Sequence, residues 1–220
     1  MKKILIIHTN YREHGGEDVA VSNEFDFLSK HFEVEKLFYN NSDKITFNEL
    51  FSFFIQSNRK SNLDLISKLN KFKPDLVYVH NTWFKAGLGI FKILEKNNIN
   101  TVIKLHNFRY SCTRSFLASN HFKNDEVCKA CGLNRKSMGF FNKYFSDSFL
   151  KSILIINYGK KYFKILKNKN FRIFVLTRYQ KEKLVIDGIQ KEIINVFPNF
   201  IKIQNENINK IREKVLVYAG

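Results

Sequence analysis

The chain has 220 residues, 44% of them hydrophobic, and its 37 lysines and arginines against 20 aspartates and glutamates give a formal net charge of +17. This length is enough for one well-buried domain of ordinary size. No apolar stretch approaches the roughly 20 residues that span a bilayer, and three cysteines do not make a disulfide-stabilised scaffold, so we expect a cytoplasmic protein in a reducing setting.

The positive charge is spread along the sequence instead of being collected in one tail. A basic surface favours anionic partners, namely phosphorylated small molecules, acidic membrane lipid or nucleic acid, and charge alone does not choose among them. The alternative is a general bias of composition toward Lys, Asn, Ile and Phe, in which this chain is rich, without selection for any partner.

The beginning of the chain predicts a strand, a glycine loop and a helix. Residues 4–7 form an apolar run typical of a strand buried on both faces of a parallel sheet, and the run is too short for the core of a signal peptide. The Gly15-Gly16 pair follows. Apolar residues then recur through residues 19–28 behind Glu17-Asp18, where acidic side chains favour the start of a helix.

The rest of the chain continues this alternation and therefore predicts an α/β fold with a doubly wound, Rossmann-like parallel sheet. Strands are predicted over residues 32–39, 76–79, 101–105, 171–176 and 192–197, and helices within residues 50–72, 84–95 and 138–169.

Two regions depart from the alternation. Residues 108–137 have no clean period, which favours a long functional or metal-bound loop. Residues 138–169 are aromatic and basic at helical spacing, and we favour a face packed on the core over a face that touches a membrane.

Polar residues follow the apolar runs at several strand ends. Ligands of open α/β sheets bind beyond the carboxyl ends of the strands, so these residues are candidates for one shared site. A single histidine after a strand is more often a capping residue than a catalyst, but three at equivalent places favour a site. The set consists of His8 and the Gly15-Gly16 loop, His80-Asn81, His106-Asn107 and Thr177-Arg178.

The three cysteines form a candidate structural zinc site. Cys128 and Cys131 have the Cys-x-x-Cys spacing, and Cys112 adds a third thiolate from the same loop. The alternative is that all three are small buried hydrophobic residues, which free cysteines commonly are.

Four segments of the sequence together resemble the motifs of a known protein family. They are His14-Gly-Gly-Glu-Asp18, Lys104-Leu-His-Asn-Phe-Arg109, Cys112 with Val127-Cys-Lys-Ala-Cys131, and Val196-Phe-Pro-Asn-Phe-Ile201. The set resembles the N-terminal half of glycosyltransferase family 4 over essentially the whole chain. The His-Asn-Phe-Arg segment with its cysteine loop is the most specific element, and it resembles a subgroup of bacterial sugar transferases that build surface polysaccharides.

The resemblance implies the domain organisation. Members have a GT-B architecture, in which two doubly wound domains face each other across a cleft, and they transfer a sugar from a nucleotide-sugar donor with retention of configuration. Residues 1–203 would form the N-terminal, acceptor-side domain. Residues 204–220 would form a linker and the first strand of a C-terminal donor-binding domain, so we expect the chain by itself to be inactive.

The resemblance also implies roles for individual residues. Gly15 and Gly16 would lie against the donor diphosphate, and His106 would be the catalytic residue facing the transferred sugar. The substrate-binding residues would be His80, Asn81, Asn107 and Arg109.

The implied partners are a nucleotide sugar and a glycan or polyprenyl-phosphate-linked acceptor, with no cofactor required beyond the candidate zinc. Related enzymes often work at the inner membrane face, so the basic charge also suggests a peripheral contact with anionic lipid. The alternatives are a noncatalytic binding or assembly module completed by a separate C-terminal domain, and a nucleic-acid-binding domain, which no recognition motif supports.

Overall fold

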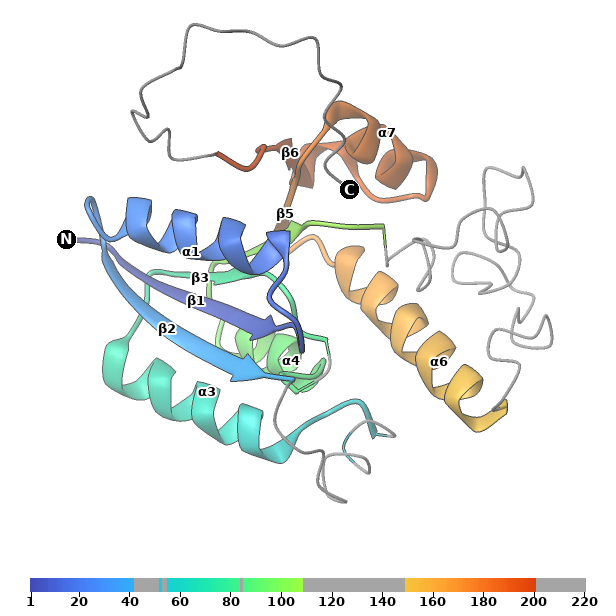
Figure 1. Cartoon of the computed structure of the whole chain (residues 1–220), viewed down its shortest axis with the longest axis horizontal. Helices are drawn as coiled ribbons and strands as arrows, with labels where there is room; N and C mark the ends of the chain where they lie inside the picture. The colour runs from blue at the N-terminus through green and yellow to red at the C-terminus, as the bar shows by residue number, and fades with distance from the viewer. Residues whose placement is uncertain (42–51, 53–54, 84, 109–148, 201–220) are drawn as a thin grey trace, which may run out of the picture.

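Six parallel strands form a single sheet in the order β2-β1-β3-β4-β5-β6 (Figure 1). The structure is a computed structural model, and it describes residues 1–41, 52, 55–83, 85–108 and 149–200. The strands are β1 (Lys3–Asn10), β2 (Glu33–Asn40), β3 (Leu76–Val79), β4 (Thr101–Leu105), β5 (Phe171–Val175) and β6 (Ile194–Val196). The predicted doubly wound, Rossmann-like α/β fold is therefore confirmed.

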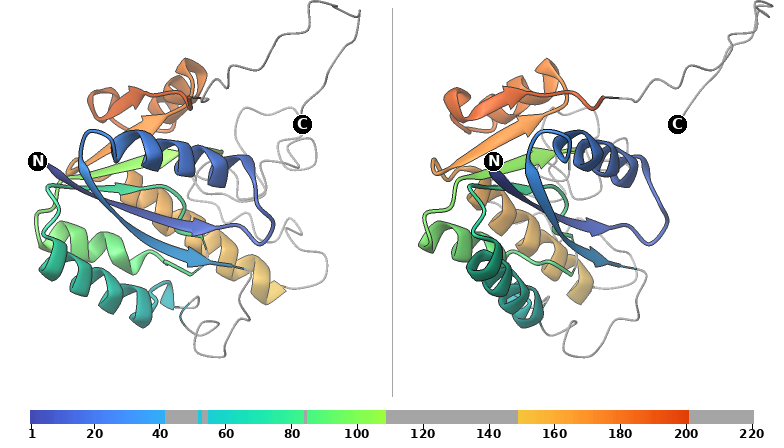
Figure 2. Two further views of the ribbon diagram at one scale, coloured as in Figure 1. Left: turned by 60° about the vertical axis from the view of Figure 1, so that its left-hand side comes forward. Right: turned by 90° about the vertical axis from the view of Figure 1, so that its left-hand side faces the viewer.

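The helices cover both faces of the sheet. Helix α1 (Gly16–Leu28) lies on one face, and α3 (Arg59–Phe72), α4 (Gly89–Lys96) and α6 (Phe149–Leu166) lie on the other (Figures 1 and 2). Helix α7 (Arg178–Ile186) and the short 3₁₀ helix η3 (Lys191–Ile193) connect β5 to β6. Each face of the sheet therefore has its own hydrophobic core.

The core beneath α3, α4 and α6 is the larger one. It joins sheet residues such as Leu5, Val79 and Ile103 to buried helix residues, including Leu65, Phe91 and Leu166. The smaller core under α1 joins Val21 to Ile4, Ile6, Tyr78 and Val102. The apolar runs at the centre of the sheet are buried on both sides, as expected for parallel strands.

The chain reverses its direction across the sheet at β1, which has β2 on one side and β3 on the other. Such a reversal leaves a crevice between the carboxyl ends of β1 and β3, because the connections that follow these two strands leave toward opposite faces of the sheet. In the register of β1 with β3, Ile7 pairs with Val79, so His8 and His80 come next at the same level.

Several element boundaries differ from those predicted. Helix α3 begins at Arg59 and not near residue 50, because the Asn58 side chain accepts a hydrogen bond from the Lys60 amide and caps the helix there. Helix α4 begins only at Gly89. Of the predicted helix 138–169, α6 is described, and its Tyr158, Phe163 and Leu166 are buried in the core, which confirms the core-facing prediction for this part.

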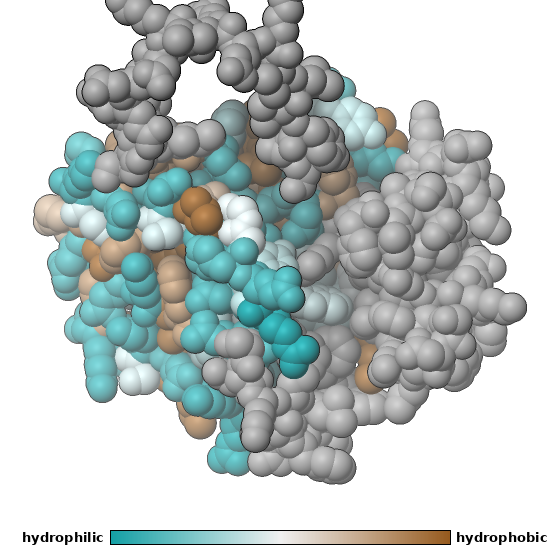
Figure 3. All heavy atoms as spheres, in the orientation of Figure 1, coloured by the Kyte–Doolittle hydropathy of each residue, from teal (hydrophilic) through white to brown (hydrophobic). Residues whose placement is uncertain are grey.

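Hydrophilic residues cover most of the described surface on the face drawn in Figure 3, with hydrophobic residues scattered among them. This distribution is ordinary for a globular domain. None of the helices in the described ranges is long and apolar enough to cross a bilayer.

Candidate functional site

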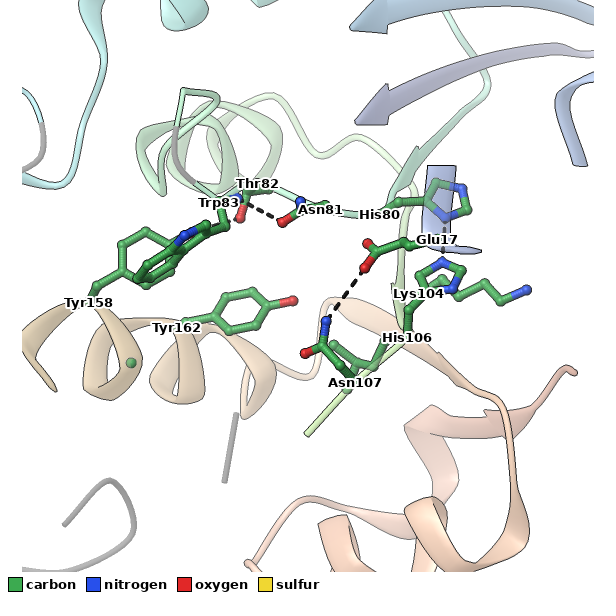
Figure 4. A pocket seen from close by; sticks show the side chains of 12 residues that line it. Glu17, His80, Asn81, Thr82, Trp83, Lys104, His106, Asn107, Tyr158 and Tyr162 are labelled. Carbon is green, nitrogen blue, oxygen red and sulfur yellow. Dashed lines mark hydrogen bonds between the residues drawn. The ribbon is translucent and has the colours of Figure 1, made fainter. Parts of the chain in front are cut away.

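A small pocket lies at the carboxyl ends of β3 and β4, beside the point where the chain reverses at β1 (Figure 4). Its volume of about 40 Å³ leaves room for ordered water or a single ligand group, but not for a whole sugar ring. Its lining residues come from the first turn of α1, from the ends of β3 and β4 with the residues that follow them, and from α6. They are Glu17, His80, Asn81, Thr82, Trp83, Lys104, Leu105, His106, Asn107, Tyr158, Gly159 and Tyr162.

Two stacked histidines form one side of the pocket. The Nδ1 atom of His80 lies 2.9 Å from the Nε2 atom of His106, and the ring centroids are 5.2 Å apart. His80 is almost fully buried, whereas His106 is partly exposed. One of the two rings donates the shared proton and the other accepts it, so at most one of these two nitrogens is protonated while both rings are neutral.

A buried carboxylate lies behind this pair. Glu24 of α1 is 3% exposed and accepts hydrogen bonds from the Lys104 ammonium and, at 2.8 Å, from the Tyr78 hydroxyl. Its Oε2 atom also lies 4.0 Å from Nε2 of His80. Lys104 is 1% exposed, which is rare for a lysine unless its charge is paired. Glu24 therefore joins α1 to both strands that end at the pocket.

Burial keeps both pocket histidines neutral at pH 7. Desolvation lowers the pKa of His106 to about 3, with a smaller contribution from the positive charge of Lys104. Desolvation also lowers the pKa of His80 well below its usual value, assisted by His106, His8 and Lys104. The pKa of Lys104 is lowered by desolvation, although Glu24 opposes that shift. Neither imidazole carries a positive charge into the pocket.

His8 lies inside β1 and not after it, so the expectation that it belongs to the open rim is wrong. Strand β1 continues to Asn10, and the His8 side chain is fully buried. Its Nε2–H donates to Oδ1 of Asp18 at 2.8 Å, and its Nδ1 accepts from the Asn81 amide at 3.4 Å. Both ring nitrogens are satisfied by a neutral imidazole. His8 therefore anchors the start of α1 to the sheet.

The glycine loop is organised around the same aspartate. The Gly15 amide donates to Oδ2 of Asp18 at 2.8 Å, and Gly15 is the residue that caps α1. Burial would raise the pKa of Asp18, but donors from Gly15, His8 and Tyr11 lower it overall. This ionised carboxylate beside the N-terminus of α1 works against a second anion at that point.

A second carboxylate, that of Glu17, points into the pocket toward Asn107 (Figure 4). Its Oε2 atom accepts from the Tyr11 hydroxyl at 2.7 Å and from Nδ2 of Asn107 at 3.4 Å. Glu17 thereby links the first turn of α1 to the end of β4. Carboxylate, amide and imidazole groups from separate segments converge on one small space.

Aromatic side chains form the opposite wall. Trp83 meets Tyr158 of α6 edge to face, with centroids 4.6 Å apart, and the Tyr158 hydroxyl lies 2.9 Å from that of Thr82. Tyr162, one turn further along α6, also lines the pocket, and its hydroxyl points toward the pocket interior in Figure 4. Aromatic faces opposite a few polar groups are the usual composition of a small-molecule site.

The structure brings together four of the predicted site residues, namely His80, Asn81, His106 and Asn107. Gly15 and Gly16 lie outside the lining, although their neighbour Glu17 belongs to it; Gly16 is exposed, and a Cβ there would meet nothing within 4 Å. Thr177 caps α7 through the Gln180 amide and does not line the pocket. Arg109 lies outside the described residues.

Glu17, Glu24 and the aromatic wall are not among the site residues predicted from the sequence. A lysine inside the apolar run of residues 101–105 was an available signal, because a charge in a doubly covered strand needs a buried partner. Nothing in the sequence identified Glu24 as that partner.

No group of histidine, cysteine or acidic side chains within the described ranges could hold a metal ion. The candidate zinc ligands Cys112, Cys128 and Cys131 lie outside those ranges, so the zinc site stays a prediction.

Comparison with protein-family models gives no match, and comparison with curated proteins gives none either. Four solved chains match the structure. One is an apo lipopolysaccharide outer core galactosyltransferase, WaaB, with 18% identity and a TM-score of 0.48 over 92% of this chain and 47% of that chain. Another is UGT2 of Phytolacca americana, complexed with UDP-2fluoro-glucose and pterostilbene, with 12% identity and a TM-score of 0.47 over 94% of this chain and 56% of that chain.

This chain thus spans about half the length of each of these two proteins. Similarity at this level concerns the overall fold and carries no argument about the reaction.

Proposed function

We propose that this chain is the acceptor-side domain of a retaining glycosyltransferase of GT-B architecture, which transfers a sugar from a nucleotide-sugar donor to a glycan or polyprenyl-phosphate-linked acceptor. The observation that carries the proposal is the convergence of His80-Asn81 and His106-Asn107 on one pocket at the reversal point of the sheet. The second of these pairs belongs to the most specific segment of the family resemblance.

The chemistry of the pocket fits a ligand rich in hydroxyl groups. Carboxylate, amide and neutral imidazole groups exchange hydrogen bonds with hydroxyls, and the rings of Trp83 and Tyr162 offer apolar surface to the carbon skeleton of a sugar. Because the pocket holds only one ligand group, we propose that a saccharide rests across its mouth and places one hydroxyl inside.

The donor diphosphate would be held mainly by a second, C-terminal domain, contributed by the same polypeptide or by a partner. On this side of the cleft, a contact with the diphosphate would fall to Gly16 and not to Gly15, whose amide is bonded to Asp18, and the diphosphate would have to lie away from the Asp18 carboxylate, which repels it. Holding donor and acceptor together supplies much of a transferase's rate, so one domain alone would have little activity.

A transfer assay tests the proposal. The polypeptide encoded by the whole reading frame that contains this sequence would be given radiolabelled UDP-glucose, UDP-galactose or GDP-mannose together with polyprenyl-phosphate-linked saccharide acceptors. Sugar transfer is expected with at least one donor, and His106→Ala is expected to lower kcat/KM by about 10²-fold. His31→Ala, which changes an exposed histidine outside the pocket, is the matched control.

Absence of transfer from every donor, in a preparation shown to be folded, would contradict the enzymatic proposal and favour a noncatalytic binding module. Full activity of His106→Ala would remove His106 from the reaction while leaving the transferase proposal in place.

We also propose a peripheral contact with anionic membrane, on the basis of the net charge of +17. Co-sedimentation with vesicles of phosphatidylglycerol is expected at low salt and should weaken as salt screens the charges. Failure to co-sediment with these vesicles even at low salt would exclude the contact.

A further inference from the structure

Two ring nitrogens beside the pocket are buried without a hydrogen-bond partner among the described residues, namely Nε2 of His80 and Nδ1 of His106. Buried polar atoms nearly always have a hydrogen-bond partner, so an unpaired one calls for an explanation in terms of strain, catalysis or a missing ligand. Both atoms belong to the histidine pair, so the placement of one proton decides what each of them can do.

Two arrangements of protons are open to the neutral pair. In the first, His106 donates from Nε2–H to Nδ1 of His80, which places the proton of His80 on its Nε2 and leaves a lone pair on Nδ1 of His106. In the second, His80 donates from Nδ1–H, which leaves a lone pair on its Nε2 and a proton on Nδ1 of His106. Both arrangements satisfy the contact of 2.9 Å.

Glu24 distinguishes between them, because its Oε2 atom lies 4.0 Å from Nε2 of His80. The Tyr78 hydroxyl fixes this oxygen from the other side, and the Lys104 ammonium is bonded to Oε1. In the first arrangement an N–H group stands opposite the carboxylate oxygen, which is attractive. In the second a lone pair stands there, which is repulsive.

The number of unpaired groups does not distinguish the two arrangements. Each arrangement leaves one N–H group and one acceptor unpaired, on Nε2 of His80 and Nδ1 of His106 in turn. The carboxylate of Glu24 therefore decides between them.

We propose that Glu24 is a positioning residue that acts through His80 to hold His106 with its proton on Nε2 and a lone pair on Nδ1, so that the pocket takes ligand groups that donate a hydrogen bond. Saccharide hydroxyls are such donors, and in this respect the inference rests on the proposed function. The oxygens of phosphate at neutral pH are mainly acceptors and do not complement the Nδ1 lone pair.

Long-range proton–nitrogen NMR spectra of the chain labelled with ¹⁵N-histidine test the first part directly at pH 7.5. Both His80 and His106 are expected to be protonated on Nε2, by more than about tenfold over the other tautomer. A proton on Nδ1 of His106, or an even mixture of the two tautomers, would overturn the proposal.

Glu24→Gln keeps the shape of the side chain but removes its charge, and it is expected to shift the His106 signals toward the other tautomer. The exposed, paired carboxylate of Glu35 provides the control, since Glu35→Gln should leave the histidine spectrum unchanged. If Glu24→Gln does not fold, Glu24→Gln/Lys104→Met removes both buried charges and carries the same expectation. Wild-type tautomers in a folded variant that lacks the Glu24 charge would contradict a positioning role.

Ligand preference is tested with two probes, methyl α-D-glucopyranoside and inorganic phosphate at equal millimolar concentrations. The glycoside is expected to move the Nδ1 signal of His106, and phosphate is expected to leave it in place. A larger shift with phosphate would overturn the inference. No shift with either probe, while the tautomers are as expected, would count against the saccharide pocket of the proposed function and not against the role of Glu24.

Discussion

Nε2 of His8 lies 2.8 Å from Oδ1 of Asp18, and this hydrogen bond joins the middle of β1 to the first turn of α1. The other carboxylate oxygen of Asp18 accepts from the Gly15 amide. One side chain thus fixes both the strand and the glycine loop that leads away from it. Glu17 directly precedes Asp18 in the first turn of α1, so the position of a pocket residue depends on this contact.

Asp18→Ala is expected to destabilise the domain by about 2–4 kcal/mol, from a lost helix cap and a buried imidazole without its acceptor. Asp18→Asn keeps an acceptor and should cost less. Asp26→Ala removes an exposed carboxylate from the same helix and should change the stability by less than about 0.5 kcal/mol. Urea unfolding measures all three variants, and equal stabilities for Asp18→Ala and Asp26→Ala would contradict the anchoring role.

The cysteine loop predicts about one zinc ion per chain after purification without added metal, as expected for a structural site of three thiolates and a further ligand. Elemental analysis measures the zinc content, and Cys128→Ser/Cys131→Ser should lose most of it. Release of zinc by a chelator should also lower the thermal stability, because metal binding is coupled to folding. Substoichiometric zinc in the unmodified chain would exclude the site.

Much of the fold could be predicted from short apolar runs separated by helical spacing, because a doubly covered parallel sheet demands such runs. The start of α3 could not be predicted in this way. The segment before it is apolar and continues the helical pattern, but Gln56 has a φ of 57° and Asn58 caps the helix at Arg59. A backbone turn of this kind depends on tertiary contacts, including the bond from Nδ2 of Asn58 to the Lys85 carbonyl.

The site was predicted only where its residues follow strands directly. His80 and His106 stand at strand ends, where topology alone brings them together. Glu24 lies in the middle of a helix, where the sequence gives a glutamate no reason to be buried. Tyr158 reaches the pocket from α6 after a long connection, and that contact depends on how the helix packs.

The buried pair of Glu24 and Lys104 predicts strong energetic coupling. Removing either charge alone leaves the other buried and unpaired, so Glu24→Leu and Lys104→Met should each cost about 3–5 kcal/mol. In a Tyr78→Phe background, where no hydroxyl loses its acceptor, the double variant should be less destabilised than either single variant in that background. Urea unfolding of the complete cycle measures the coupling.

The exposed pair of Lys68 and Glu35, with 37% and 39% of each side chain exposed, is the matched control for this cycle. Its coupling should be no more than about 1 kcal/mol. If the destabilisations of Glu24→Leu and Lys104→Met add up to that of the double variant, the two charges are not coupled.

The buried histidines predict a loss of stability in mild acid. Burial lowers the pKa values of His8, His80 and His106, the last to about 3, so between pH 6.5 and 3 the unfolded chain binds protons that the folded chain does not. The contribution of these neutral histidines to the free energy of unfolding is therefore fully present above about pH 6.5. It falls as the pH drops, by up to about 1.4 kcal/mol per pH unit for each histidine. Asp18, whose pKa is also lowered, adds to the loss below its ordinary value of 3.8.

Urea unfolding at pH 7, 6, 5 and 4 measures this slope. His106→Asn is expected to reduce the slope below pH 6, because it removes one group that takes up a proton only on unfolding. His31→Asn, which changes an exposed histidine outside the pocket, is the matched control and should leave the slope unchanged. A stability that stays constant from pH 7 to pH 5 would mean that the folded chain binds these protons, and a charged His80–His106 pair would then have to replace the neutral one.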